Sequence, residues 1–375
     1  MESGTRAIVI IGGGLIGLSA AFHLRRADRQ ARVTVLERAR VGDAASSASA
    51  AGVRVMGRDP AERAIALESL GRWPELDREL DAKTGYRRSG GLRVALDEAG
   101  WAEARATVGE QHAAGVPVEL VDAPAALRLA PGLSPECRGG VHCALDGQAE
   151  AVATVRAWAT AARRLGVRIE EGVGAEALLF EGPRVVAVMG TGGARLPCDT
   201  ALVAAGAWSA PLLAKIGVRL PLRGRGLQML LTDTAPASLT PVVGCFGRPL
   251  SLKQLADGAY LIGGGWPARI PDEAVNRWEI LDDSVRGSLG VARAVYPPLA
   301  ARSVSRSWAG IEAFTEDDLP VLGPVPGLDG LLVAAGFSGH GFALVPAVGD
   351  VLARLALGLD PLAHLWRGLG AARLA

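Results

Sequence analysis

Residues 6–17, Arg-Ala-Ile-Val-Ile-Ile-Gly-Gly-Gly-Leu-Ile-Gly, decide the fold. The apolar run from Ala7 to Ile11 predicts a buried parallel strand. It leads into the pattern Gly-x-Gly-x-x-Gly, after which apolar residues recur at helical spacing. A second strand is expected from Arg32 to Leu36, and it ends on Glu37. This order of strand, glycine turn, helix, strand and acid is typical of a dinucleotide-binding βαβ unit.

Each glycine of the pattern has a physical task. Gly12 allows a tight turn, Gly14 lets a pyrophosphate approach bare backbone, and Gly17 lets the helix pack closely on the strand. The helix N-terminus offers N–H groups to phosphate. Glu37 is placed to accept hydrogen bonds from a ribose diol. The alternative is a tight strand–helix turn without a ligand.

The composition is that of a globular protein with two lobes, because 375 residues exceed one typical core. The net charge of +1 gives no electrostatic reason to expect nucleic acid or an anionic membrane surface as a partner. The first strand is expected to begin at residue 6, so we expect no signal peptide. The uncharged stretch 330–349 is broken by glycines and Pro346, so we expect no transmembrane segment and a cytoplasmic location.

The four cysteines form no Cys-x-x-Cys pair, so neither a zinc site nor a redox motif is predicted. We therefore expect free thiols and no bound metal.

A run of small residues from Gly42 to Gly52 follows the second strand. Its low bulk and its hydroxyl groups suit backbone that lies against a phosphate or a flat ring. A flexible surface loop is the alternative. Arg54 follows this run, and its side chain points either into a pocket or into solvent.

The rest of the chain alternates between helical and extended patterns. Helices are predicted over 60–83, 101–114, 149–165 and 272–294. A strand pair broken at Gly90-Gly91 is predicted over 86–96, and strands are predicted over 118–121, 167–170, 175–180 and 184–189. Residues 218–266 are rich in strand patterns. A buried strand within 199–208 ends on Gly206, where the chain again allows close approach to a ligand.

The chain closes with a second unit of strand, glycine loop and helix. The strand is expected from Leu331 to Ala335, the loop reads Gly336-Phe-Ser-Gly-His-Gly-Phe342, and the helix begins near Pro346. The positive end of this helix points at whatever fills the loop.

These motifs together resemble the D-amino-acid oxidase superfamily. The resemblance rests on the N-terminal fingerprint, the serine run to Gly52, Ala-Ala-Gly206-Ala-Trp208, Trp308-Ala-Gly310 and the loop from Gly336 to Phe342. The segment 306–342 is most similar to the branch that contains D-hydroxyproline dehydrogenase and the related flavoproteins of hydrogen cyanide synthase and opine oxidase.

The resemblance implies an α/β fold (α+β overall). A Rossmann-like lobe for FAD would be built from residues 1–80, 146–210 and 305–375. Monomeric sarcosine oxidase relatives tether the flavin through a cysteine near Trp308-Ala-Gly310, where this chain has none, so we expect non-covalent FAD. A substrate lobe with a large mixed sheet would be built from residues 81–145 and 211–304. It further implies oxidation of a C–N bond in an amino acid or secondary amine, with hydride transfer to flavin N5 and an imine product. The cofactor contacts it implies are Gly12, Gly14, Leu15, Ile16, Gly17, Glu37, Arg38, Ser46, Ser47, Ala51, Gly52, Val53, Val173, Ala205, Gly206, Trp208, Gly310, Gly336, Ser338, Gly339, His340, Gly341 and Phe342.

The sequence departs from the resemblance at the substrate. Glycine oxidase holds the substrate carboxylate with an arginine shortly after Trp-Ala-Gly, where this chain has Ile311-Glu312, and its last glycine loop also carries an arginine that is missing here. Arg54, Arg223 or Arg225 replaces that clamp, or the substrate presents another group. Glu312 can hold a cationic amine or can be a solvated carboxylate. We expect His340 to contact the flavin edge, and a loop histidine without a role is the alternative.

The expected electron acceptor is not oxygen. Sarcosine oxidase-like enzymes place a lysine near the flavin, whereas the matching strand here, Ala259 to Gly263, has none. The most similar branch works with partner subunits that carry further redox cofactors, so we expect such partners, with peripheral membrane association through an acceptor complex as an option. The alternatives are an oxidase that uses O₂, a flavin hydroxy-acid dehydrogenase and a non-catalytic flavoprotein subunit.

Overall fold

The first strand, β1 (Ala7–Ile11), lies inside a six-stranded sheet in the computed structural model, which describes residues 5–374. The strand order is β20-β21-β12-β1-β2-β8, and every pairing is parallel except that of the edge strand β20. The other strands are β2 (Arg32–Glu37), β8 (Arg168–Glu171), β12 (Thr200–Val203), β20 (Val321–Pro324) and β21 (Leu331–Ala335). All five residues of β1 and of β21 are buried, as expected for central strands of a parallel sheet.

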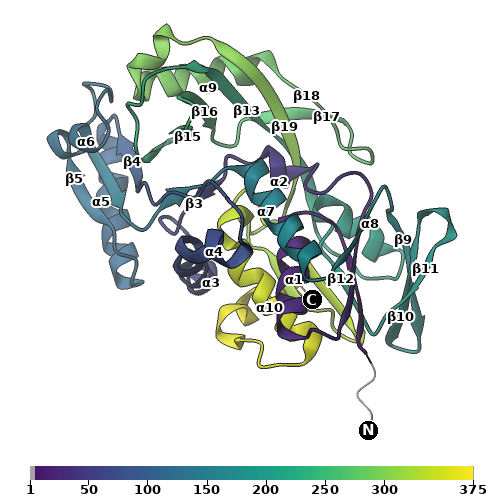
Figure 1. Ribbon diagram of the computed structural model, residues 1–375. Helices are drawn as coiled ribbons and strands as arrows, with labels where there is room; N and C mark the ends of the chain where they lie inside the picture. The colour runs from purple at the N-terminus through teal and green to yellow at the C-terminus, as the bar shows by residue number, and fades with distance from the viewer. Residues whose placement is uncertain (1–4, 375) are drawn as a thin grey trace.

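Helices and a small sheet cover the two faces of this sheet (Figure 1). On one face, α1 (Leu15–Ala27) packs against α7 (Ala151–Arg164) and α10 (Val345–Leu357). On the other face lie α8 (Ser209–Ala214) and a three-stranded sheet of β9 (Ala175–Glu181), β10 (Arg184–Gly190) and β11 (Arg195–Pro197). The expected Rossmann-like nucleotide lobe is therefore present, with an apolar core on each side of its sheet.

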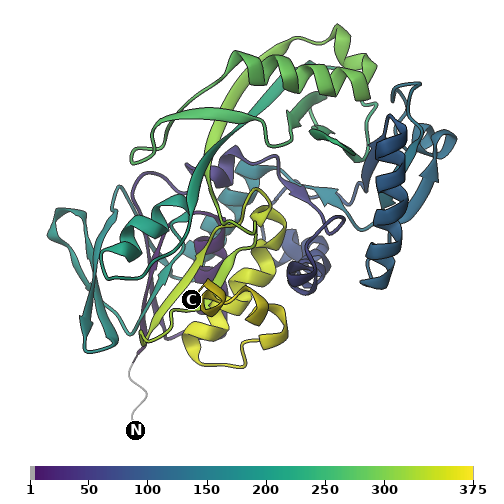
Figure 2. The same ribbon diagram turned by 180° about the vertical axis from the view of Figure 1, so that it is seen from behind.

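A ten-stranded mixed sheet forms the second lobe, seen from behind in Figure 2. Its longest pair is β13 (Arg223–Thr234) with β19 (Val304–Phe314), and its main path runs β18-β17-β13-β16-β15-β14-β4-β6-β5. The remaining strands are β4 (Gly91–Ala95), β5 (Glu119–Asp122), β6 (Gly139–Cys143), β14 (Val242–Cys245), β15 (Arg248–Gln254), β16 (Ala259–Gly263), β17 (Pro267–Asp272) and β18 (Arg277–Glu279). The helices α5 (Glu98–Ala113), α6 (Ala123–Leu129) and α9 (Asp282–Val295) accompany it.

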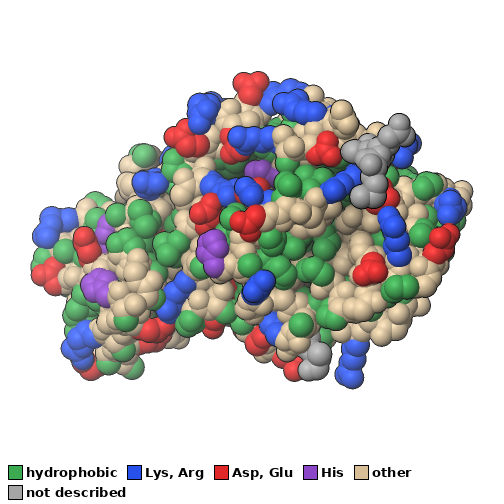
Figure 3. Space-filling view, turned by 90° about the horizontal axis from the view of Figure 1, so that it is seen from below, with side chains coloured by type: hydrophobic (Ala, Val, Ile, Leu, Met, Phe, Trp, Pro, Cys, Tyr) green, Lys and Arg blue, Asp and Glu red, His purple; other side chains and the backbone are tan. Residues whose placement is uncertain are grey.

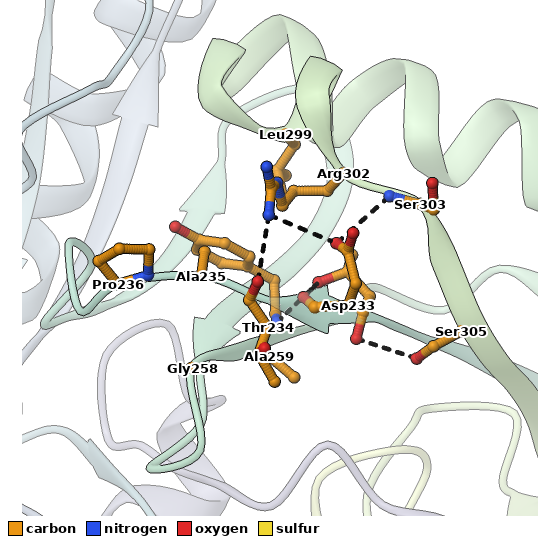
Figure 4. A network of polar contacts seen from close by, with 12 residues as sticks. Asp233, Thr234, Ala235, Pro236, Gly258, Ala259, Leu299, Arg302, Ser303 and Ser305 are labelled. Atoms are coloured by element: carbon orange, nitrogen blue, oxygen red, sulfur yellow. Dashed lines mark hydrogen bonds and ion pairs between the residues drawn. The ribbon is translucent and has the colours of Figure 1, made fainter.

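Polar contacts around Asp233 join the end of β13 to the start of β19 (Figure 4). The Asp233 backbone N–H donates to the carbonyl oxygen of Ser303 at 2.9 Å. The Arg302 guanidinium donates to the Thr234 carbonyl oxygen at 3.1 Å, and the Ser305 hydroxyl donates to that of Thr232 at 2.9 Å. These bonds satisfy backbone groups at the irregularity between Leu231 and Thr232, where the ladder changes register.

Short elements connect the lobes. They are α2 (Ala45–Ala48), the pair β3 (Gly52–Val53) with β7 (Gly147–Gln148), α3 (Pro60–Arg72) and α4 (Leu76–Leu80). The division of the chain into five lobe segments stays a proposal. β19 begins at Val304 and pairs along its length with β13, so the large sheet includes residues that the boundary at 305 gives to the nucleotide lobe.

One predicted helix has the wrong start, and one helix was not predicted. The helix expected over 272–294 begins only at Asp282, because residues 267–279 form the hairpin of β17 and β18. Asn276 closes that hairpin in the left-handed region at φ 55°, a conformation that asparagine tolerates. Helix α6 was missed, although Asp122 caps it by accepting from the Ala125 N–H at 2.9 Å and Pro124 lies in its first turn.

Basic and acidic side chains are interspersed on the face seen from below (Figure 3), in keeping with a net charge of +1. Within residues 5–374, no helix is long and apolar enough to span a bilayer. In the same range, no three His, Cys, Asp or Glu side chains come together in a metal-binding group.

Candidate functional site

A cavity of about 570 Å³ extends along the edge of the six-stranded sheet where its central strands end. It begins near Glu37 at the end of β2, passes the turn between β1 and α1, and reaches the loop after β21. The residues of the sequence prediction that line it are Gly12, Gly14, Leu15, Ile16, Glu37, Arg38, Ser46, Ala205, Gly206, Trp208, Glu312, Gly336, Gly339, Gly341 and Phe342. The fold thus brings together segments that lie up to 330 residues apart in the sequence.

Bare backbone is required where β1 turns into α1. Gly12 has φ +114°, and a Cβ atom there would lie 2.3 Å from the carbonyl oxygen of Ala204. A Cβ atom on Gly17 would lie 2.1 Å from the carbonyl oxygen of Gly12, so this glycine serves helix packing and does not line the cavity. The first turn of α1 then faces the cavity with N–H groups that have no partner within the helix. The Ser46 hydroxyl accepts from one of them, the Leu15 N–H, at 3.0 Å.

Glu37 holds its carboxylate at one end of the cavity through two backbone bonds. Oε2 accepts from the Gly13 N–H at 2.8 Å, and Oε1 accepts from the Ala39 N–H at 2.9 Å. Each carboxylate oxygen has a second lone pair. The side chain can therefore accept hydrogen bonds from two ribose hydroxyl groups while it keeps its two bonds to the backbone.

The opposite end of the cavity is built by β19 and the glycine loop after β21. Ile311, Glu312 and Ala313 line it from β19, and Phe342 and the loop glycines line it from the other side. Ser338 adopts φ 48°, and its hydroxyl donates to the Gly336 carbonyl oxygen at 3.2 Å, which fixes the tight turn. Burial raises the pKa of the Glu312 carboxyl to about 7, although the Gly339 backbone N–H counteracts the shift. A titratable acid thus lies at this end of the cavity.

Several expected contacts do not line the cavity: Gly17, Ser47, Ala51, Gly52, Val53, Val173, Gly310, Ser338 and His340. Close packing explains the glycine at position 310, because a Cβ atom there would lie 2.6 Å from Cβ of Ala48 on α2. Trp308 supports the same contact by donating to the Ala48 carbonyl oxygen at 3.1 Å.

The three candidate arginines lie outside the cavity lining. Arg223 is 81% exposed and pairs with Glu316 at 3.6 Å, which makes it a poor replacement for a buried carboxylate clamp. The guanidinium of Arg225 lies over the Phe314 ring, 4.6 Å from its centroid. Arg54 is exposed. The structure therefore supplies no arginine clamp from these residues as they stand.

A buried charged group below the glycine loop escaped the sequence analysis. Arg58 donates through Nη2 to the His340 carbonyl oxygen at 2.9 Å and through Nε to that of Arg54 at 3.2 Å. Glu62, in the first turn of α3, lies 3.5 Å from Arg58 Nη1 and 3.3 Å from His340 Nδ1. Burial lowers the pKa of Arg58 to about 10. The only sequence signal was the i, i+4 spacing of Arg58 and Glu62.

Lys253 was not predicted to lie near the flavin, because it is on β15 and not on the strand expected to carry a flavin-side lysine. In the sheet, however, Lys253 is directly opposite Leu261 of that strand. Its Nζ donates to the Ala149 carbonyl oxygen at 2.7 Å, and burial lowers the pKa of the ammonium group to about 7. A lysine of variable charge is therefore present between the two lobes.

Comparison with known proteins agrees with this geometry. The family described as DAO, FAD dependent oxidoreductase, matches residues 7–355. The chain belongs to this family. Hydrogen cyanide synthase subunit HcnC of Pseudomonas aeruginosa is 29% identical to it, over 94% of this chain and 92% of the relative. Glycine oxidase of Geobacillus kaustophilus is also 29% identical, over 93% of this chain and 92% of the relative.

The fold is shared with solved structures. The crystal structure of glycine oxidase from Geobacillus kaustophilus has a TM-score of 0.86 and 26% identity, and it covers 95% of this chain and 96% of that one. L-proline dehydrogenase from P. horikoshii has the same TM-score at 24% identity, with 99% of this chain and 100% of that one covered. The expected fold class is confirmed.

Membership of this family confirms two further expectations. The cofactor is FAD, and the chain is an enzyme of the amino-acid oxidase and dehydrogenase class. At the level of the family, the reaction is FAD-dependent oxidation of amino-acid C–N bonds. The cavity fits FAD: it has bare backbone and a helix N-terminus for the pyrophosphate, a carboxylate for the ribose and a glycine loop at the other end.

Proposed function

We propose that this enzyme is a dehydrogenase that oxidises a C–N bond of an amino acid or secondary amine and passes the electrons to an acceptor other than oxygen. The observation that carries the substrate part is Glu312, a carboxyl group with a pKa of about 7 that lines the cavity beside the glycine loop. An amine substrate is cationic in water, and a carboxylate favours such a group.

FAD, when bound, supplies the acceptor for the hydride that leaves the substrate carbon. The chain's own residues position both partners. The β1–α1 turn and Glu37 would hold the nucleotide half. Phe342 and the glycine loop would border the ring half, and the loop leads through residues 341–344 into α10, whose N-terminus carries a partial positive charge.

Glu312 would have two tasks at the reacting end. As a carboxylate it binds the ammonium form of the substrate. An amine must lose a proton before its nitrogen lone pair can assist departure of the α-hydrogen, and an acid with a pKa of about 7 is well matched to accept that proton at neutral pH. His340, whose backbone carbonyl oxygen accepts from Arg58, would lie at the border of this site.

The cavity lacks the arginine that would bind the carboxylate of a simple α-amino acid, so we infer a different kind of substrate. Relatives named glycine oxidase and hydrogen cyanide synthase subunit HcnC suggest a small amino acid or amine as the substrate. None of Arg54, Arg223 and Arg225 lines the cavity. A secondary amine or a diamine that relies on Glu312 for recognition therefore suits the site better than glycine.

The acceptor part of the proposal rests on the charge near the flavin end. Oxygen reduction is favoured by a fixed positive charge close to the ring, because superoxide-like charge develops there. Lys253 does not line the cavity, is bound to the Ala149 carbonyl oxygen and is only partly charged at neutral pH. Partner subunits that accept the electrons remain part of this proposal.

An anaerobic panel of amines tests the proposed function. The purified holoenzyme is mixed without oxygen with glycine, sarcosine, proline, hydroxyproline and diamines, and bleaching of the flavin absorbance is followed. Reduction by a secondary amine or diamine faster than by glycine supports the proposal. Reduction only by hydroxy acids, or by nothing in a panel of amines and amino acids, contradicts it.

A further inference from the structure

The β17–β18 hairpin of the large sheet reaches the nucleotide end of the cavity. Its tip, residues 273–276, lies between the last pair of the hairpin, Asp272 with Arg277. Ala274, Val275 and Asn276 line the same cavity as Glu37 and Gly12. The tip belongs to the second lobe, which was expected to hold substrate and not cofactor. In Figure 1 the hairpin extends from the large sheet toward the lobe that contains α8.

Three hydrogen bonds join the hairpin tip to the nucleotide lobe. Trp208 Nε1 donates to the Glu273 carbonyl oxygen at 2.8 Å. Asn276 Nδ2 donates to the Asp43 carbonyl oxygen at 3.2 Å. Arg38 donates to the Ala274 carbonyl oxygen. These bonds satisfy backbone carbonyl groups on both sides, so the position of the tip relative to Glu37 is specified by several independent contacts.

Arg38 and Trp208 form a flat surface at this end. The Arg38 guanidinium lies 3.6 Å from the centroid of the Trp208 ring, a stacked cation–π arrangement. Val275, at the hairpin tip, is 67% exposed and is thus an apolar side chain left open beside the cavity. A flat apolar ring that entered here would meet a planar group and a valine. Glu37, which precedes Arg38 in the sequence, would hold the sugar attached to that ring.

We propose that the hairpin tip is part of the adenosine site, where Val275 covers the adenine ring of FAD and the bonds from Arg38, Trp208 and Asn276 hold the tip in place. The second lobe then contributes directly to retention of the cofactor. Entry and exit of the nucleotide half require the hairpin to lift, so FAD release is slow. The inference rests on the family's cofactor and not on the proposed substrate.

The hairpin can be shortened without disturbing its strands. Replacing residues 273–276 by Asn-Gly leaves a two-residue loop between Asp272 and Arg277, the loop length and sequence that favour a tight hairpin. Two point variants serve if the shortened chain fails to fold. Val275→Ala removes the apolar cover, and Trp208→Phe keeps an aromatic ring but removes the bond to the Glu273 carbonyl oxygen. Val152→Ala is the matched control, because Val152 is a valine on α7 that is 47% exposed.

The test measures the rate of FAD release from each holoenzyme, followed as flavin fluorescence after dilution. We expect release about tenfold faster from the shortened hairpin and about fivefold faster from Trp208→Phe, the loss of one hydrogen bond. Val275→Ala should also release FAD faster, and Val152→Ala should match the unchanged protein. Far-UV circular dichroism and the melting temperature of each holoenzyme report whether the fold is retained.

Two results would overturn the inference: equal release rates from all folded variants, or faster release from Val152→Ala as well, which would indicate general loosening. The readout does not depend on turnover. If no amine bleaches the flavin but hairpin variants lose FAD faster, the proposed reaction fails while the adenosine site stands. If amines bleach the flavin but release rates are unchanged, the adenosine site is wrong while the proposed reaction stands.

Discussion

Arg225 on β13 and Glu312 on β19 are directly opposed in the large sheet, yet their charged groups do not pair. The Arg225 guanidinium lies over the Phe314 ring, and the Glu312 carboxyl lines the cavity. Opposed residues of an antiparallel pair share one face of the sheet, so an ion pair was available. Burial raises the pKa of Glu312 to about 7. Since Arg225 does not pair with it, the acid is left for a ligand.

This arrangement predicts a pH dependence. Glu312 binds a cationic amine only when ionised, so kcat/KM should rise as the pH increases through about 7. Glu312→Gln should flatten the rise and lower flavin reduction at pH 8 by at least tenfold. Glu316→Gln, on the exposed acid that pairs with Arg223, is the control and should leave the profile unchanged. A profile that keeps its rise in Glu312→Gln would assign the pKa to another group.

The same shift affects folding stability with a definite sign. Because the pKa of Glu312 is raised in the fold, the native protein retains this proton up to a pH of about 7, whereas the unfolded chain releases it near the ordinary value of 4.5. Between these values the contribution of Glu312 to stability falls as the pH rises. Glu312→Gln should therefore be less sensitive to pH between 5 and 7 in urea unfolding, a comparison that needs no substrate.

Glu37 is predicted to determine FAD affinity. Glu37→Ala removes charge-assisted hydrogen bonds to the ribose, about 1.5–3 kcal/mol each, so the FAD dissociation constant should rise at least tenfold. It also removes the acceptors of the Gly13 and Ala39 N–H groups, which loosens the turn. Glu181→Ala, on an exposed acid of β9, is the control. An unchanged dissociation constant, measured by fluorescence titration, would make Glu37 a structural residue only.

FAD is predicted to be bound without a covalent bond. The four cysteines, Cys137, Cys143, Cys198 and Cys245, are free and buried, and none lines the cavity. Burial raises the pKa of Cys143 and of Cys198 to about 12, so these thiols stay protonated and unreactive at neutral pH. Acid precipitation should release all yellow colour into the supernatant. Colour that remains in the pellet would contradict the prediction.

Breaking the buried pair of Arg58 and Glu62 by removing one partner is predicted to destabilise the fold. Arg58→Met leaves a carboxylate buried without its cation and should cost about 3–5 kcal/mol of unfolding free energy. The double variant Arg58→Met/Glu62→Met removes both charges and should recover most of that loss. Arg78→Met breaks an exposed pair with Glu75 and should cost less than about 1 kcal/mol. Urea unfolding in excess FAD gives these values, and a double variant as unstable as Arg58→Met would count against the pairing.

The sequence was sufficient where the signal is local. The turn from β1 into α1 could be predicted because its glycines, the strand and the acid lie within 32 consecutive residues, from Arg6 to Glu37. The contact between Arg58 and His340 could not be predicted, because 282 residues separate them and only the fold joins the segment before α3 to the glycine loop. Lys253 was excluded for a related reason: it lies outside the strand Ala259 to Gly263, and its position opposite Leu261 depends on strand pairing, which a single strand pattern does not reveal.

The hairpin at 273–276 shows why a helical sequence pattern alone did not predict the structure of this segment. Residues 272–294 contain a helical pattern, and the structure keeps it from Asp282 onward. The first part forms strand and turn instead, because its backbone pairs with β17 and its tip is bound by Trp208 and Arg38. Tertiary contacts of this kind override local propensity.

The last prediction is that the reduced enzyme reacts slowly with oxygen. A positive charge near the flavin accelerates this reaction. The candidate for this charge is Lys253, and burial lowers the pKa of its ammonium group to about 7. At pH 8 most of this ammonium group has lost its proton, so stopped-flow reoxidation in air-saturated buffer should be slower than turnover with an artificial acceptor dye. As the pH falls below 7 the lysine gains its charge, and any oxygen reaction should become faster. Lys253→Met should remove that increase, whereas Lys215→Met, on a lysine bound to the Glu176 carbonyl oxygen, should not. Reoxidation at pH 8 that outpaces the dye would identify an oxidase and refute the dehydrogenase proposal.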